Sequence, residues 1–285
     1  MADHDGKSAN GRARLEEAVR APARSGRLAL AAFLTAGHPD RERFPGLLNA
    51  VAEVADVVEL GVPFSDPMAD GVTIQRASRD ALAGGASLRW LLAMLAAASP
   101  RPRAPLVLMS YLNPLLAFGL ERLPGAAVGA GVAGLIVPDL PLEESETIRA
   151  ALAPAGIALV QMVTPVTPAE RLRLIGAVSE GFTYAVTVTG TTGGSVEADG
   201  EVARYLGRAR AASPVPLMAG FGIRDASQVR ALAGRADGVI VGSALIEAIE
   251  AGRDPAAFLR ELMADARPPG RAESAPRRDG REATP

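Results

Sequence analysis

Short apolar runs alternate with longer amphipathic segments along most of this chain. Each run is rich in Val, Leu and Ile and is followed by a segment rich in Ala, Leu and Arg. This alternation is typical of βα units that feed a parallel sheet. Eight runs are predicted to be strands: Leu28–Thr35, Val57–Gly61, Leu106–Ser110, Gly134–Val137, Ala158–Val163, Thr183–Thr187, Pro216–Ala219 and Gly238–Val241.

Most of the predicted strands are continuously apolar, without alternation between apolar and polar positions. Continuous runs are expected where both faces of a strand are covered by protein. Eight such units favour a closed (β/α)8 TIM barrel, which typically forms one domain of about 250 residues. An open, doubly wound sheet shares the alternation and remains the alternative. Its usual G-x-G-x-x-G motif, however, does not follow the first strand.

The two ends of the chain differ from the middle. Residues 1–14 form a polar N-terminal extension, and residues 15–265 are predicted to form the barrel domain. Within that range Leu15–Val19 could form a short extra helix before the first strand, or could be unstructured. Residues 266–285 are dense in Pro, Arg, Glu and Gly, which predicts a disordered tail.

Composition excludes several classes of function. Among the 285 residues, 48% are hydrophobic, but no uninterrupted apolar stretch reaches the roughly 18 residues of a membrane span. The polar start lacks the apolar core of a secretory signal, so a cytoplasmic location is expected. The absence of cysteine excludes disulfides, thiolate metal sites and cysteine nucleophiles. A net charge of −2 gives no footprint for nucleic acid or an anionic membrane.

The first candidate for chemistry is Glu59, near the end of the apolar strand Val57–Gly61. An ionised carboxylate is costly to bury, so such a group is normally paired, neutralised or functional. Active sites of TIM barrels gather at the C-terminal ends of the strands, which makes Glu59 a catalytic candidate. A structural ion pair, or a carboxylate that accepts from loop amides, is the alternative.

The loop Pro63–Gly71 follows immediately and carries two aspartates. Asp66, before a proline, is most simply a turn residue. Asp70 could be the N-cap of a helix from Thr73 onward or a second catalytic carboxylate, and spacing alone favours the cap. Two carboxylates from one βα unit can nevertheless divide proton transfers between them.

Three glycine-rich loops indicate a phosphate site: Thr189–Gly194, Gly220–Gly222 and Gly242–Ser243. They follow the sixth, seventh and eighth predicted strands. TIM barrels often bind phosphate with the loops after strands seven and eight and the N-terminus of a short helix, which Ser243 could begin. The alternative is that each glycine only permits a tight turn.

Other candidate residues are less diagnostic. Phe33, Tyr111 and Tyr184 lie at or near strand ends and could line an aromatic pocket or only fill the mouth of the barrel. His38 is interpreted as a solvated loop residue without a role. With no cysteine and no second histidine in the folded region, the sequence predicts neither a metal site nor a Ser-His-Asp triad.

A family resemblance sharpens these interpretations. The stretch Val58–Gln75 closely resembles the signature of tryptophan synthase α chains, and the similarity covers roughly residues 15 to 265. Further similar segments are Phe33–Gly37, Met109–Pro114, Val137–Pro141, Gly220–Ile223 and Gly242–Ala244. Thr191 departs from the valine that is common at its position, and the charged tail extends past the usual end.

The resemblance implies a lyase that splits indole-3-glycerol phosphate into indole and glyceraldehyde 3-phosphate by a retro-aldol reaction, without a cofactor on this chain. Asp70 would hold the indole N–H and stabilise positive charge, while Glu59 would move protons at indole C3 and the glycerol hydroxyl. Under this resemblance the capping alternative for Asp70 loses most of its weight. The implied substrate-binding residues are Phe33, Ile74, Tyr111 and Tyr184 near the indole, Thr192, and the backbone amides of Gly193, Gly222, Gly242 and Ser243 for the phosphate.

The resemblance also implies a partner. The family's α chains bind a tryptophan synthase β chain that carries pyridoxal phosphate, in an α2β2 heterotetramer, and the β chain receives indole through an internal passage. Pro63–Gly71 and Thr189–Gly194 resemble the family's two mobile segments that close over substrate, and Asp139 falls where the family touches the β chain.

Two rival functions remain. An indole-glycerol-phosphate synthase or a phosphoribosyl isomerase would share the phosphate loops, but neither is expected to carry the segment from Glu59 to Asp70. A synthase would also need a lysine acid, whereas Lys7 is the only lysine. A non-catalytic subunit that only activates a β chain would not need to keep either carboxylate.

Overall fold

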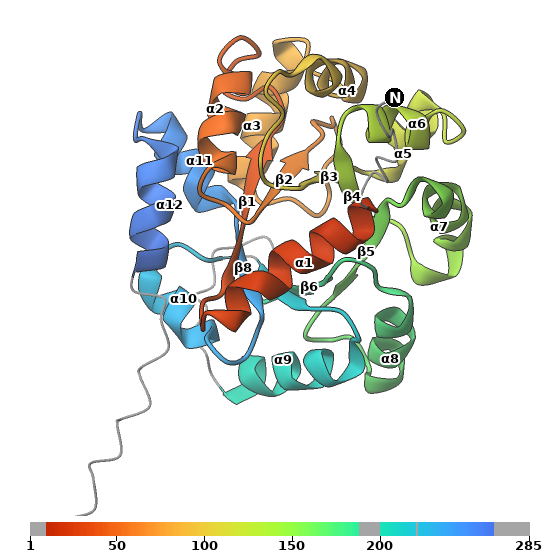
Figure 1. Ribbon diagram of the computed structural model, residues 1–285, viewed down its shortest axis with the longest axis vertical. Coiled ribbons are helices and arrows are strands. Elements are labelled where there is room, and N and C mark those ends of the chain that lie inside the picture. The colour runs from red at the N-terminus through yellow and green to blue at the C-terminus, as the bar shows by residue number, and fades with distance from the viewer. Residues whose placement is uncertain (1–9, 188–199, 221, 265–285) are drawn as a thin grey trace, which may run out of the picture.

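Eight parallel strands close into a barrel in chain order. A computed structural model describes residues 10–187, 200–220 and 222–264 (Figure 1). This closed sheet confirms the predicted (β/α)8 barrel and excludes the open, doubly wound alternative. The strands are β1 Ala29–Thr35, β2 Val57–Gly61, β3 Leu106–Met109, β4 Val132–Ile136, β5 Ala158–Val163, β6 Thr183–Val186, β7 Leu217–Gly220 and β8 Gly238–Val241.

Helices surround the strands on the outside of the barrel (Figure 1). An apolar cluster between the strands and these helices forms one part of the core, and inward-facing side chains inside the barrel form a second. The helices are α1 Gly11–Arg24, α2 Phe44–Ala52, α3 Val72–Ala83, α4 Leu88–Ala97, α5 Leu112–Phe118, α6 Leu123–Gly129, α7 Glu146–Leu152, α8 Ala169–Val178, α9 Gly200–Ala212, α10 Ala226–Leu232, α11 Ser243–Glu250 and α12 Pro255–Ala264, with short 3₁₀ turns at Leu142–Glu144 and Ala153–Ala155.

Helix α1 crosses the N-terminal end of the barrel (Figure 1, red). Its Leu15 and Val19 are fully buried and belong to the cluster inside the barrel. The expected helix at Leu15–Val19 is therefore present but longer, since residues 11–14 of the expected polar extension are also helical. So short a segment is marginal in isolation, and burial against the strands stabilises it.

Strand β4 begins at Val132, two residues before its predicted start at Gly134. In the structure Gly134 lies inside β4, where a Cβ would come within 2.8 Å of Leu15 Cδ2. The glycine thus provides room for α1, although glycine generally weakens a strand. Strands β2, β5 and β8 have their predicted bounds.

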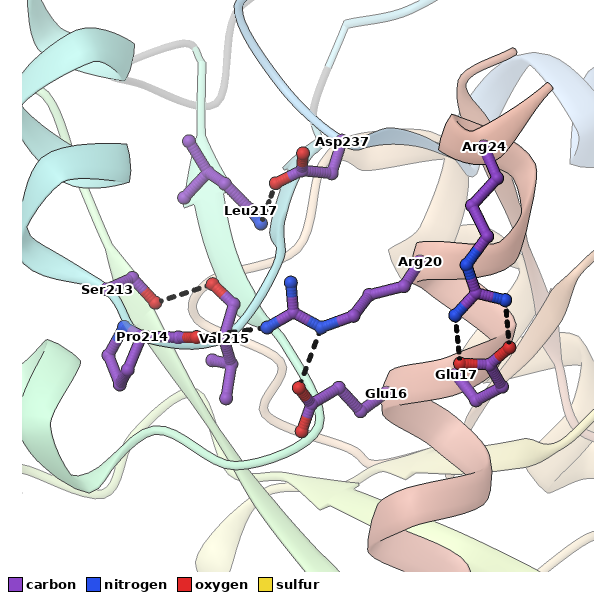
Figure 2. Close-up of polar contacts among 9 residues, drawn as sticks. All are labelled: Glu16, Glu17, Arg20, Arg24, Ser213, Pro214, Val215, Leu217 and Asp237. Atoms are coloured by element: carbon purple, nitrogen blue, oxygen red, sulfur yellow. Dashed lines mark hydrogen bonds and ion pairs between the residues drawn. The ribbon is translucent and has the colours of Figure 1, made fainter. Parts of the chain in front are cut away.

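Charged side chains connect helix α1 and the loops at the N-terminal end of the barrel. Figure 2 shows Arg20 of α1, which donates to Glu16 at 2.8 Å and to the Pro214 carbonyl at 3.0 Å. In the same view the Asp237 carboxylate accepts the Leu217 amide of β7 at 2.8 Å. The loop before β7 is therefore held to α1, and the first residue of β7 is held to the loop before β8.

The contact made by Asp237 recurs at two further strands. In each case a carboxylate just before one strand accepts the amide of a residue on a neighbouring strand and also pairs with an arginine. The three sets are Asp56 with the Leu30 amide and Arg27, Glu180 with the Leu159 amide and Arg12, and Asp237 with the Leu217 amide and Arg210.

No helix within the described ranges has the length and apolarity needed to cross a membrane. In those same ranges, no three His, Asp or Glu side chains gather as a metal site would require.

Candidate active site

Glu59 points into the barrel. Along β2, Val57 joins the interior cluster while Val58 and Leu60 join the outer one, so alternation turns Glu59 inward. The residue is 1% exposed, and neither carboxylate oxygen has a hydrogen-bond partner among the described residues. The ion-pair and amide-capping alternatives for Glu59 therefore find no support in the described part of the chain.

Burial sets the protonation of Glu59. Loss of solvation raises the pKa of its carboxyl to about 8, and the negative charge of Asp70 adds to this effect. A carboxyl with this pKa is mostly protonated at pH 7. It can therefore donate a proton, which an ordinary glutamate at this pH cannot do.

Asp70 is not a helix cap. The N-cap of α3 is Gly71, which makes no side-chain cap bond, so the capping interpretation that spacing favoured is wrong. Asp70 is instead 7% exposed, and its carboxylate is hydrogen-bonded to Tyr111. Burial raises the pKa of Asp70 to about 6, while the hydrogen bond from Tyr111 lowers it. Asp70 is thus mostly ionised at pH 7.

Tyr111 holds the loop that carries Asp70. Its hydroxyl accepts the Ala69 amide at 2.9 Å, and its ring lies 5.3 Å from that of Phe64 at an interplanar angle of 31°. Phe64 was not singled out from the sequence, although an aromatic residue next to Pro63 was the available signal. The loop is therefore attached to the start of α5 through one tyrosine.

The predicted indole-lining residues come together. Phe33 and Tyr184 belong to the interior cluster, and Ile74 of α3 packs against it. Two glycines admit the rings: a Cβ at Gly61 would lie 2.4 Å from Phe33 Cζ, and one at Gly220 would lie 2.5 Å from the Tyr184 hydroxyl. The mouth of the barrel is consequently lined by apolar and aromatic side chains.

Tyr184 shares the electrostatic environment of the two carboxylates. Burial raises the pKa of its hydroxyl, and the charges of Glu59 and Asp70 raise it further. The structure thus brings β2, the loop after it and β6 to one place. The Tyr184 hydroxyl therefore lies close enough to both carboxylates to interact with their charges.

Part of the predicted phosphate site is described. Gly242 is the N-cap of α11 without a side-chain cap, and Ser243 is the first residue of that helix. Gly222 follows β7 with φ +81°, a left-handed backbone that favours glycine. Thr192, Gly193 and the whole loop Thr189–Gly194 lie outside the described residues. The first amides of a helix lack intrahelical partners and favour anions.

His38 contradicts the expectation of a solvated loop residue. It is 5% exposed, and its Nε2 lies 3.3 Å from Glu250 Oε1 of α11. Burial lowers the pKa of the His38 imidazole, although Glu250 acts in the opposite direction. The sequence could not show this burial because the covering helix is more than 200 residues away in the chain.

Comparisons with known proteins agree with this geometry. Residues 20–272 match the family model described as tryptophan synthase alpha chain. The tryptophan synthase alpha chain of Nitratidesulfovibrio vulgaris strain DP4 is 48% identical over 248 residues, which cover 87% of this chain and 96% of that relative. The one from Deinococcus radiodurans is 42% identical over 255 residues, covering 89% and 94%.

Solved structures give the same result. Tryptophan synthase subunit alpha from Legionella pneumophila superposes with a TM-score of 0.78 at 34% identity, covering 89% of this chain and 97% of that one. A tryptophan synthase chain from Mycobacterium tuberculosis gives 0.81 at 36% identity, covering 89% and 98%. With a closed barrel, two buried carboxylates at its mouth and relatives of this similarity, the chain belongs to the tryptophan synthase α-chain family.

Proposed function

We propose that Glu59 and Asp70 carry out the chemistry of this chain, which as a member of its family is the lyase that cleaves indole-3-glycerol phosphate. The observation that carries this assignment is the pair of buried carboxylates whose pKa values, about 8 and about 6, are pushed apart by their surroundings. Such a pair separates an acid role from an ionised role at neutral pH.

In the proposed reaction, protonated Glu59 gives its proton to C3 of the indole ring. The positive charge that this creates on the ring is stabilised by ionised Asp70, which also holds the indole N–H. The Glu59 carboxylate then takes the proton of the glycerol hydroxyl next to C3. The electron pair of the breaking carbon–carbon bond returns to the ring, so indole and glyceraldehyde 3-phosphate are released and Glu59 is protonated again.

The substrate would lie between the aromatic mouth and the phosphate loops. We assign the indole ring to Phe33, Ile74, Tyr184 and Tyr111, which line or border the mouth. The phosphate is assigned to Gly222, Gly242 and Ser243 together with Thr192 and Gly193. Its negative charge would then meet the positive end of the α11 dipole.

A partner completes the proposal. We assign to this chain a tryptophan synthase β chain in an α2β2 assembly, with pyridoxal phosphate on the β chain, and we keep the cytoplasmic location predicted from the sequence. Met68 lies in the loop that carries Asp70 and Val72 directly follows that loop, and they are 84% and 70% exposed. Exposed apolar side chains beside a site are typical of a protein contact. Asp139, expected at that contact, is exposed and accepts the Leu112 amide at 2.9 Å.

The test is release of glyceraldehyde 3-phosphate from indole-3-glycerol phosphate, with and without a β chain, followed by a coupled dehydrogenase. Turnover that rises on addition of the β chain is expected. The value of kcat/KM should be bell-shaped with pH, with limbs near the pKa values of the two carboxylates. A folded chain that binds inorganic phosphate but shows no turnover in either condition would instead identify a non-catalytic subunit.

A further inference from the structure

Glu247 of α11 connects two separate parts of the site. Its Oε1 accepts the hydroxyl of Thr73 at 3.0 Å, and its Oε2 pairs with the guanidinium of Arg224. Thr73 is a buried residue in the first turn of α3, and Arg224 lies in the loop between β7 and α10. One carboxylate therefore contacts two elements that are far apart in the sequence.

Each of these two contacts lies close in the chain to a proposed site residue. Thr73 lies three residues after Asp70, and Arg224 lies two residues after Gly222. Glu247 itself lies four residues after Ser243, so the two side chains share a face of α11. Arg224 is in turn fixed to α10, because its amide donates to Gln228 Oε1 at 2.7 Å.

We infer that Glu247 is a positioning residue that sets the distance between the phosphate loops and the Asp70 carboxylate. This inference rests on the proposed function, in which one substrate must reach both places at once. The phosphate loops hold one end of the substrate. Because Asp70 lies just before α3, the placement of α3 then determines where Asp70 meets the indole ring at the other end. A misplacement of about 1 Å can cost on the order of a hundredfold in rate.

A second polar pair joins the same two helices without touching the phosphate loop. Glu250, one turn after Glu247, pairs with Arg76 of α3 and lies near His38. If Glu247 only helped to pack α3 on α11, loss of Glu250 would have the same effect as loss of Glu247. Glu250→Gln is therefore a matched control on the same helix.

Three variants separate the two contacts of Glu247. Glu247→Gln keeps a carbonyl oxygen for Thr73 but removes the charge that pairs with Arg224. It should raise KM and the dissociation constant of inorganic phosphate about threefold, as expected for a part-exposed ion pair, with kcat within about twofold.

Thr73→Val keeps the shape of the side chain and removes the other contact, the hydrogen bond to Glu247. It should lower kcat about tenfold, because a small misplacement of Asp70 lowers the rate, and leave phosphate binding unchanged. Glu247→Ala should show both effects.

The measurements are kcat and KM of the complex with a β chain, phosphate binding by calorimetry, and thermal unfolding to show that each variant is folded. The inference would be supported by a change in KM and phosphate binding in Glu247→Gln and a change in kcat in Thr73→Val, with Glu250→Gln close to wild type. The same change in both variants, or a loss of kcat in Glu250→Gln as large as in Thr73→Val, would overturn it while the lyase assignment stands. Absence of wild-type turnover would overturn the proposed function. In that case phosphate binding still tests this inference, and an unaltered dissociation constant in Glu247→Gln would overturn it.

Discussion

Three carboxylates at the N-terminal end of the barrel differ from Glu59 at the C-terminal end in whether they have partners. At the N-terminal end, Asp56, Glu180 and Asp237 each accept a strand amide and pair with an arginine. At the C-terminal end, the oxygens of Glu59 have no hydrogen-bond partner among the described residues, and burial raises its pKa to about 8. The carboxylates of Asp56, Glu180 and Asp237 are thus paired, whereas the carboxylate of Glu59 is not.

This difference separates stability from function. A paired carboxylate that caps a strand contributes to folding, as residues at the N-terminal face of this fold generally do. An unpaired buried carboxyl costs stability when ionised, and it persists where its unusual protonation is useful. Variants at the two ends should therefore affect different measurements.

The largest expected effect is on the rate of Glu59→Gln. Because the amide cannot donate and accept the proton, kcat should fall by about 10²- to 10⁴-fold, the usual contribution of general acid–base catalysis. The dissociation constant of inorganic phosphate should stay within about twofold, since the phosphate residues lie on other loops. Near-normal turnover of this variant would contradict the assignment of Glu59.

The same variant should change how stability depends on pH. The pKa of the Glu59 carboxyl is raised from 4.5 to about 8 on folding. Between these two pH values the folded chain keeps the proton and the unfolded chain has lost it. Wild-type stability from this group is therefore present below pH 4.5 and is lost as pH rises through 8. Relative to Glu59→Gln, the wild type should lose roughly 3–5 kcal/mol between about pH 5 and 9.

Urea unfolding of both proteins across this pH range measures the difference. Parallel stability curves for the two proteins would show that Glu59 is not buried as a neutral acid.

At the opposite end, Asp237→Ala should affect stability and not rate. The variant removes the acceptor of the Leu217 amide and the partner of Arg210. The free energy of unfolding should fall by about 2 kcal/mol, in the range for hydrogen bonds to charged groups. The value of kcat should stay within about twofold, because the site lies at the other end of the strands. A tenfold loss of kcat in folded protein would break the proposed division between the two ends.

The smallest expected effect is on Tyr111→Phe. The hydrogen bond from Tyr111 lowers the pKa of Asp70, so its loss should raise that pKa and move the lower limb of the kcat/KM profile to higher pH. A shift of up to about one unit is expected for one lost hydrogen bond. A limb that stays in place or moves to lower pH would remove Tyr111 from this role.

Much of the fold could be predicted because strand formation depends on local pattern. Strands β2, β5 and β8 have their predicted bounds, and each is an apolar run that ends at a turn. The helix α1 was predicted too short because its charged first residues carry no local signal. Its stability comes from burial of Leu15 and Val19 inside the barrel.

The site was predicted less evenly. Glu59 stood out because a carboxylate in an apolar strand conflicts with its neighbours in the sequence. Asp70 was ambiguous from its spacing, since a cap and a buried acid have the same spacing, and the structure decides between them because Gly71 is the N-cap of α3 and Asp70 is buried. His38 was wrongly interpreted as solvated and Glu247 was not singled out, because their partners come from distant parts of the chain.

By itself, the sequence determined the barrel, the two carboxylates and the family, because apolar periodicity and a long motif are properties of neighbouring residues. The tertiary structure decided which carboxylates are satisfied and which are not. That outcome depends on the groups that folding brings within hydrogen-bond distance and on the solvent that it excludes. A pKa of about 8 at Glu59 is thus a property of the closed barrel, and no local stretch of residues contains it.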